Sequence, residues 1–503
     1  MIAQPIRILT LLSITCLLST TLLAVTGRSQ FTIRSQGMNM PRNMVGMEPY
    51  DYCLKDGFPC FYFGITPAFS QSFSDDNLEQ YLFFNGTNTM TFGPLGDRET
   101  DVFARNFLLN DDFRGNVTIK PDIQSMVLDL QFRISLNKIA CGLYLETYIP
   151  VTWSQWDLHM EERVRSSGTF VEANKLGNAT RENSFLKTII RAWQGDTIDV
   201  NTFPAVRNDM DFATVNGKRS EIALADVYLG LGYTIIKKPD WQVDLQLLYI
   251  APAGKRPEPR YFFNAQVGNG KHNAIGGALH TYHNVFTGDD TALTGVFDIR
   301  AYHFFGASQR RTFDLNANGI GSRYLLFKRF NPDTGTPTGE IVFGPNVTTL
   351  DCNVSVGAVA EATMMATYDW YKWQFNVGAN AWIQSKEHIT LKQDIPARTF
   401  GIQGNTNSNA NQTASQTLIN GQNANMFDPL GFPVFIGTAS INLDSAKTPT
   451  ATSYMLFAHA SRTWKNNPLE PFVGIGGELE LSAFSNKALE QFSIWFKAGF
   501  SYA

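Results

Sequence analysis

Charged side chains recur at alternate positions in segments of this sequence that are otherwise rich in apolar residues. Between residues 126 and 136, Asp129 and Arg133 fall on one alternating set, and Met, Leu, Phe and Ile residues fill the other. A β-strand points successive side chains to opposite faces, so such a segment has a polar and an apolar face. The charged residues that this alternation places on polar faces are Asp129, Arg133, Glu146, Asp226, Asp244, Asp298, Arg300, Glu361, Glu478, Glu480 and Lys497.

The chemistry of this set is electrostatic. Carboxylates outnumber bases in it by eight to three, and rings of carboxylates attract cations at close range. We therefore expect these residues to line a water-filled lumen with weak cation preference. The open alternative is that they pair with one another and fill the interior of a closed structure.

His459 and Ser461 stand two positions apart, where an imidazole can activate a hydroxyl on the same face of a strand. No Asn or Asp lies in an obvious supporting position, and we expect His459 to face the lumen. His280 and His283 are three apart in a predicted strand, so they point to opposite faces and share no metal ion. The sequence contains no zinc-protease, nucleophile-elbow or phosphate-loop motif. We expect no enzyme, no metal site and no cofactor.

Cys53 and Cys60 enclose a short loop that contains Gly57 and Pro59. In an oxidising compartment, two cysteines at this spacing are candidates for a local disulfide. Two separate thiols are the alternative. The spacing does not indicate zinc, because no second cysteine pair follows.

Twelve segments show the alternation of a strand, and most form hairpins around turns of two to four residues. We predict strands at 61–73, 126–136, 139–146, 223–236, 241–251, 274–285, 291–303, 354–368, 371–384, 453–464, 471–483 and 489–502. Short turns alternate along the chain with long, polar segments. Short turns at one end and long loops at the other are typical of a transmembrane antiparallel β-barrel.

The predicted count is twelve strands, which is even and puts both ends of the barrel on the short-turn side. Residues 323–330 and 340–350 form a predicted hairpin above the membrane, and residues 182–193 a predicted short helix in a loop. If that hairpin, or residues 432–443, crossed the membrane, the count would rise to fourteen.

The last predicted strand carries an alternating apolar face that ends close to the C-terminus. Its members are Phe492, Ile494, Phe496, Phe500 and Tyr502. This strand resembles the assembly signal of Gram-negative outer-membrane β-barrel proteins of the porin-like kind, although Ala503 puts the final aromatic residue one place early. The resemblance implies insertion into the bacterial outer membrane by the barrel assembly machinery and, in many members, passive diffusion. Outer-membrane phospholipases of twelve strands also carry a His-x-Ser pair. Their pair lies on the lipid-facing surface of the barrel, whereas the pair in this sequence is expected to face the lumen.

Composition agrees with an exported barrel. Charged residues make up 17% of the chain and aromatic residues 13%, and the net charge of −4 leaves no basic surface for nucleic acid. Residues 1–26 have the pattern of a signal peptide. Residues 27–60, which include a Met-rich run, are expected to form a periplasmic or plug-forming segment ahead of the barrel of residues 61–503.

The function we expect is a porin-like channel for passive diffusion of small polar solutes or ions. The alternatives are a surface-display, adhesion or structural protein that acts through its long loops, and a plugged channel for hydrophobic compounds. The expected partners are outer-membrane lipid, the assembly machinery, small polar solutes or ions and, in an oligomer, further copies of the chain.

Overall fold

The computed structural model describes residues 34–35, 37–46, 54–55, 58–73, 78–79, 82–169, 186–196, 209–215, 217–403, 413–423, 433–464, 469–483 and 490–502. The predicted signal peptide and Cys53 lie outside these residues. The statements that follow concern the described part of the chain.

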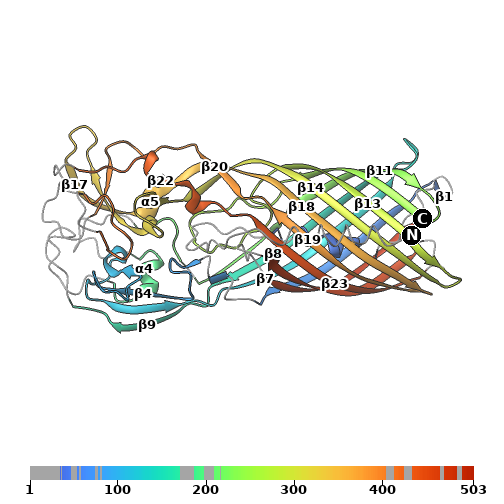
Figure 1. Cartoon of the computed structure of the whole chain (residues 1–503), viewed down its shortest axis with the longest axis horizontal. Helices are drawn as coiled ribbons and strands as arrows, with labels where there is room; N and C mark the ends of the chain where they lie inside the picture. Colours follow the sequence, from blue (N-terminus) through green and yellow to red (C-terminus); the bar gives the residue numbers. More distant parts are fainter. Residues whose placement is uncertain are drawn as a thin grey trace, which may run out of the picture.

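Twelve strands form a closed antiparallel barrel (Figure 1). They are β3 (Phe61–Ser72), β7 (Asp122–Ser135), β8 (Leu143–Asp157), β11 (Val227–Lys237), β12 (Trp241–Ala251), β13 (Ala274–Thr287), β14 (Thr291–Thr312), β18 (Thr349–Trp370), β19 (Trp373–Gln384), β23 (Ala451–Thr463), β24 (Pro471–Ala483) and β25 (Gln491–Tyr502). Each pairs with its neighbours along the chain, and β3 closes the ring by pairing with both β25 and β7. The predicted twelve-stranded barrel is confirmed.

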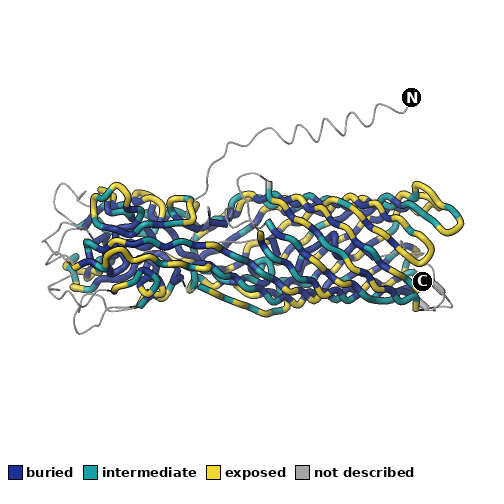
Figure 2. The backbone as a smooth tube through the Cα atoms, turned by 90° about the horizontal axis from the view of Figure 1, so that it is seen from below, coloured by how far each residue is buried: buried dark blue, intermediate teal, exposed yellow. Residues whose placement is uncertain are grey.

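Alternation along the strands separates the two faces of the wall, as Figure 2 shows by burial. In β7, Asp129 and Arg133 are buried, whereas Met126 is 55% exposed and Phe132 is also exposed. The other strands repeat this pattern with Leu, Ile, Val and aromatic residues on the outside. The outer surface of the barrel is therefore an apolar belt, as a wall in contact with lipid requires.

The second strand of the first hairpin begins later than the sequence indicates. Residues 136–142 form a turn in which Ile139 is 76% exposed, and β8 starts at Leu143. Gly142 has φ +84°, a left-handed conformation that glycine adopts without strain, and its N–H donates to Asn137 Oδ1 over 2.7 Å. The predicted two-residue turn is wrong because these contacts hold a longer one.

Two short strands lengthen the wall at one end of the barrel. β10 (Lys218–Leu224) pairs with β8 beyond the end of β11, and β20 (Glu387–Leu391) pairs with β18 beyond the end of β19. Neither adds a member to the ring. Ala225 and Asp226 separate β10 from β11, so the wall is interrupted there.

The long connections pack into a second body, which we call the cap, at one end of the barrel (Figure 1). It comprises the described residues that connect β3 to β7, β8 to β11, β12 to β13, β14 to β18 and β19 to β23. Its sheets consist of β4 (Thr89–Gly93), β5 (Val102–Phe103), β6 (Arg114–Thr118) and β9 (Glu161–Ser166); of β16 (Leu326–Phe330), β17 (Pro337–Phe343) and β21 (Phe400–Ile402); and of β15 (Asp314–Leu315) with β22 (Ile441–Asn442). The hairpin of β16 and β17 lies here, so it does not raise the strand count to fourteen.

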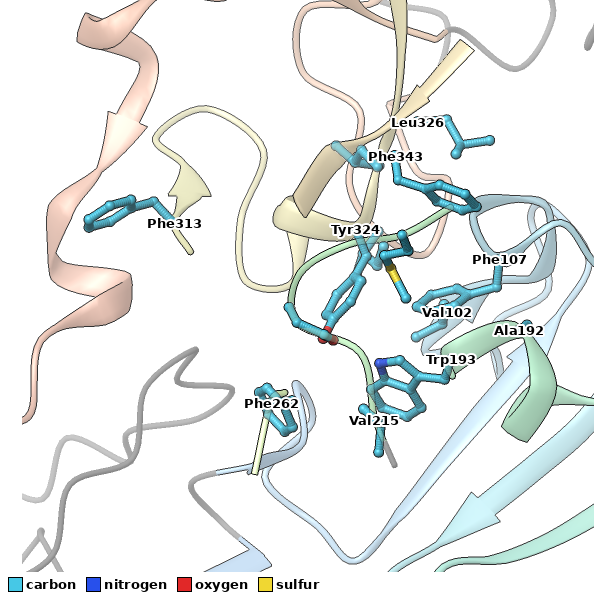
Figure 3. Packing of buried hydrophobic residues seen from close by; sticks show 14 of the residues in the cluster. Val102, Phe107, Ala192, Trp193, Val215, Phe262, Phe313, Tyr324, Leu326 and Phe343 are labelled. Carbon is cyan, nitrogen blue, oxygen red and sulfur yellow. The ribbon is translucent and has the colours of Figure 1, made fainter. Parts of the chain in front are cut away.

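The cap has a hydrophobic core of its own, centred on Trp193 at the end of α4 (Ile189–Trp193) (Figure 3). The indole lies 5.7 to 6.5 Å, between ring centroids, from Phe83, Phe92, Phe107, Phe262 and Tyr324. A helix of five residues, α5 (Gly344–Thr348), follows β17 and lies at the edge of this core. The sequence predicts irregular polar loops here, whereas the structure buries aromatic residues from different loops against each other.

Two further elements precede the barrel. The helix α2 (Met40–Met44) begins after Asn39, whose side chain accepts a hydrogen bond from Arg42 N over 2.8 Å. The strands β1 (Leu54–Lys55) and β2 (Phe58–Pro59) form a small hairpin immediately before Cys60. Of the helices that the structure describes, none is long and apolar enough to cross a membrane.

Candidate functional site in the barrel lumen

The structure buries every one of the eleven predicted lumen residues. The strands β7, β8, β12, β14, β18, β24 and β25 carry ten of them on the inward face, and Asp226 stands just before β11. Burial of so many charges requires compensation, since an unpaired charge in a protein interior is strongly unfavourable. The partners divide the ten residues on the strands into two groups.

The first group pairs within the wall. Arg133 lies over the ring of Tyr144, 4.0 Å from its centroid, with its guanidinium 3.6 Å from Asp244. Arg300 donates to Asp298 over 3.1 Å, and His280 Nδ1 contacts the second oxygen of the same carboxylate. Glu146 accepts hydrogen bonds from Tyr148 and Gln246. This side of the lumen carries its own counter-charges.

The second group pairs with residues 34–46, which we call the N-terminal segment. Arg42 donates to Asp129 of β7 over 2.6 Å, and Asn39 donates to Glu478 of β24 over 2.5 Å. Arg34 donates to Glu361 of β18 over 3.0 Å and lies 3.5 Å from Glu480 of β24. Because these carboxylates face inward from different strands, the segment that joins them lies inside the barrel.

Lys497 of β25 holds the end of helix α2. Its ammonium donates to the carbonyl oxygens of Arg42, Asn43 and Val45 over 3.0, 3.0 and 2.7 Å. The last carbonyl groups of a helix lack partners within it, and a cation at that end is favourable. Lys497, predicted as a lumen charge, therefore anchors the N-terminal segment to the closing strand.

Apolar contacts and small cavities complete the filling of the lumen. Met40, Met44 and Val45 pack with inward residues of the wall such as Val127 and Trp495. Beside Met44 a cavity of about 20 Å³ is lined by Arg133, Glu146, His280 and Arg300, among others. A second, of about 40 Å³, lies beside Arg34 and Trp382. Each has room for only one or two water molecules.

The second cavity is bounded on the cap side by His272, Gln309 and Glu387. Burial lowers the pKa of His272, which lies in the connection before β13. The imidazole is therefore neutral at pH 7, with Nδ1 2.8 Å from the carbonyl oxygen of Phe305 and Nε2 3.2 Å from Gln309 Nε2. A neutral ring in this position adds no positive charge at the mouth of the lumen.

The seam between β3 and β25 contains an interruption. Pairing runs to Trp495 with Ala68 and resumes at Ala498 with Ile65, which omits the two pairs between. Pro67 explains the gap, because proline has no N–H to donate to the ladder. A groove of about 600 Å³ lies at this position on the outer surface of the barrel. Its lining is mainly apolar and includes Pro67, Phe69, Leu128, Ile494 and Phe496.

The His459 and Ser461 pair has a partner that the sequence does not indicate. His459 Nδ1 lies 3.2 Å from Asn376 Oδ1 on the adjacent strand β19, so the expectation that no Asn supports it is wrong. Asn376 lies opposite His459 in the register of two strands, and that register follows from the fold. His459 and Ser461 are nevertheless buried in the filled lumen, which leaves no access for a substrate.

Two further predictions depend on residues near the ends of strands. Cys60 is buried, but Cys53 lies outside the described residues, so their disulfide stays a prediction.

The sequence favours Trp153 and Trp156 as members of an interfacial aromatic girdle. Trp153 fits this position on the outer face, but Trp156 is fully buried against Phe263 of the cap, because residues three apart in a strand face opposite sides.

Sequence reasoning missed Arg34, Asn39 and Arg42 as lumen residues. They lie outside the alternating segments, so periodicity carries no signal for them. The one signal in the sequence is the Met-rich run nearby, which includes Met40 and Met44 and suits a segment that plugs the barrel.

The wall thus has an apolar exterior, a polar interior and no free edge in the ring, which is the arrangement of barrels that cross the bacterial outer membrane. The chain is an outer-membrane β-barrel protein. No protein-family model matches it, and no curated protein sequence is significantly similar to it.

Solved structures of similar fold include an outer membrane channel from Pseudomonas putida F1 (TM-score 0.35, 9% identity, 91% of this chain and 100% of that chain). The Pseudomonas putida toluene transporter TodX matches with a TM-score of 0.33 at 9% identity over 95% of both chains. A Pseudomonas aeruginosa FadL homologue matches with a TM-score of 0.29 at 8% identity, over 95% of this chain and 99% of that chain. At these values the likeness carries no argument about what this chain transports.

Proposed function

We propose that this protein is a gated outer-membrane channel for small polar solutes and cations, with the N-terminal segment as its plug. The observation that carries this proposal is the set of contacts from Arg34, Asn39 and Arg42 to four wall carboxylates. A segment that fills the lumen through side-chain contacts, rather than as a strand of the wall, can leave without breaking the barrel.

The character of the inner wall favours polar solutes. Displacing the N-terminal segment removes two arginines and uncovers Asp129, Glu361, Glu478 and Glu480. The wall bases Arg133 and Arg300 keep their own wall partners, Asp244 and Asp298. The opened lumen therefore gains negative charge on one side and attracts cations.

The experiment compares planar-bilayer conductance of the full chain with that of a variant lacking residues 27–46. Heat-modifiable migration in electrophoresis shows that both are folded. We expect conductance to rise at least about tenfold on deletion, with a reversal potential in a KCl gradient that reports cation preference. Arg310→Ala, which removes an exposed ion pair with Asp351 outside the lumen, serves as the matched control and should leave conductance unchanged. A folded deletion variant with unchanged conductance, or with anion preference, contradicts the proposal.

The groove at Pro67 supports a second candidate, a channel for hydrophobic compounds. Its apolar lining lies where the pairing of β3 with β25 is interrupted, next to the wall position at which Lys497 holds α2. Such a channel would pass apolar molecules between lumen and membrane. In that case the deletion variant would keep low ion conductance and raise the uptake of an apolar fluorophore by cells instead.

A further inference from the structure

The guanidinium of Arg34 lies in a pocket that belongs entirely to the barrel wall. Glu361 Oε2 is 3.0 Å from Nη2, Glu480 Oε1 is 3.5 Å from Nη1, and Met455 Sδ accepts from Nη1 over 3.3 Å. The ring of Trp382 lies 5.7 Å from Cζ. These four side chains, which we call the guanidinium pocket, are all buried.

The pocket is built on four consecutive strands, β18, β19, β23 and β24. Glu361 pairs directly with Trp382, and Met455 pairs directly with Glu480. Strand register therefore holds these groups in place whether or not the N-terminal segment is present. Groups fixed by rigid elements form a preorganised binding site.

The chemistry of the pocket selects a guanidinium rather than an ammonium. A guanidinium is planar, donates in several directions at once, is weakly hydrated and stacks on aromatic faces. Two carboxylates on different strands match its fork of N–H donors, and Trp382 offers the face of a ring. An ammonium is compact and strongly hydrated, so it gains less from this combination.

We propose that the guanidinium pocket binds guanidinium-bearing solutes of the channel and that Arg34 occupies it as a tethered substitute while the plug is in place. This inference rests on the proposed function and adds the class of solute. The cavity of about 40 Å³ beside Arg34 and Trp382 lies on the cap side of the pocket.

The test uses the full chain with Arg34→Ala, which empties the pocket and leaves the wall unchanged. Methylguanidinium, methylammonium and neutral methylurea are added at low millimolar concentration. Two quantities are measured: the heat-induced unfolding temperature of this chain in detergent, and block of the current in planar bilayers through the variant lacking residues 27–46. We expect methylguanidinium to raise the unfolding temperature and to block at a concentration at least about tenfold lower than methylammonium, with no effect of methylurea.

Two double variants locate the effect. Arg34→Ala with Glu361→Gln should lose the response to methylguanidinium, since one carboxylate of the pocket is gone. Arg34→Ala with Asp289→Asn, a matched change in the exposed turn between β13 and β14, should keep it. The wild-type chain, with Arg34 in the pocket, should not respond. Free arginine and the tripeptide Gly-Arg-Gly then show whether the pocket accepts an amino acid, a peptide or both.

Equal effects of methylguanidinium and methylammonium, or a response that survives Glu361→Gln, would overturn the inference. A thermal response in the absence of current through any variant supports the pocket and contradicts the channel. Current through the deletion variant without any guanidinium preference supports the channel and contradicts the pocket. The two proposals therefore fail independently.

Discussion

At the scale of single residues, Lys497 links the plug to the strand that closes the barrel. Its three hydrogen bonds all go to main-chain carbonyl groups of residues 42–45, so the contact depends on the path of the segment rather than on its side chains. A side chain that recognises a backbone path holds it in one position. Lys497 is thus the wall residue whose loss should affect the plug most directly.

Lys497→Met keeps the length of the side chain and removes all three donors. Hydrogen bonds from a charged group contribute about 1.5–3 kcal/mol each to stability, and about 1.4 kcal/mol corresponds to a tenfold change in an equilibrium. Loss of one such bond alone corresponds to roughly 10- to 100-fold, so we expect the open probability in planar bilayers to rise by at least about tenfold. The matched control is Lys271→Met, because Lys271 also donates to main-chain carbonyl groups, those of Pro252 and Ala253, but in a loop. A folded Lys497→Met protein with wild-type gating would show that this contact does not hold the plug.

At the scale of elements, the strand β25 determines whether the ring closes. It pairs with β24 on one side and β3 on the other, and its outward residues lie in the apolar belt. The interruption at Pro67 removes two residue pairs from the ladder of this seam. Its outward side chains therefore matter more for closure than those of a fully paired strand.

Phe496→Asp places a carboxylate on this outer face. The register of β25 and β3 puts position 496 opposite Pro67. Phe496 is 48% exposed on the outside of the barrel, and a charged side chain in the lipid-facing belt opposes insertion. We expect loss of the heat-modifiable folded form and of surface protease resistance in cells. Thr336→Asp, in the exposed turn of the cap hairpin between β16 and β17, adds the same charge away from lipid and should assemble normally. Stable insertion of Phe496→Asp would argue against β25 as the closing strand.

At the scale of the whole molecule, the barrel and the cap have different sources of stability. The barrel relies on its ladder of main-chain hydrogen bonds, and the cap on the packing of aromatic residues from four connections around Trp193. The core of the cap also includes Ile123 of β7, Trp156 of β8 and Val354 of β18, but the barrel's ladder does not run through it, so we expect the two bodies to unfold separately.

Trp193→Ala tests that separation. Removing a fully buried indole costs roughly 3–5 kcal/mol in the unit to which it belongs. We expect faster hydrogen exchange at the amides of β6 and β16 in the cap, with protection of β18 and β19 below the cap unchanged. Trp370→Ala, at the exposed end of β18 by a short turn, is the matched control and should leave the cap protected. Equal loss of protection in cap and barrel would show that they form one cooperative unit.

The amino-acid sequence alone is sufficient to predict the wall of this protein. Alternation with a period of two follows from the geometry of a single strand, so it can be recognised without any knowledge of the partner strands. Strands β12 and β24 have the predicted bounds, and Phe496 and Asp129 face the predicted sides. Closure of β25 on β3 also followed from the strand count, because an unpaired edge cannot lie in lipid.

The residues that fill the barrel are brought together by the three-dimensional fold and not by any local pattern. Arg34 and Glu361, or Asn376 and His459, are far apart in the chain and meet through register and closure, which leave no local pattern. The same holds for the cap, where Trp193 and Tyr324 come from different connections. Periodicity reports how a backbone turns its side chains, and it cannot report which distant side chain each one meets. Ten of the eleven charged residues that the alternation selects lie on the inward faces of strands, and Asp226 lies between β10 and β11. Arg133 and Arg300 have partners in the wall itself, whereas the chain's own N-terminal segment supplies the partners of Asp129, Glu361, Glu478 and Lys497.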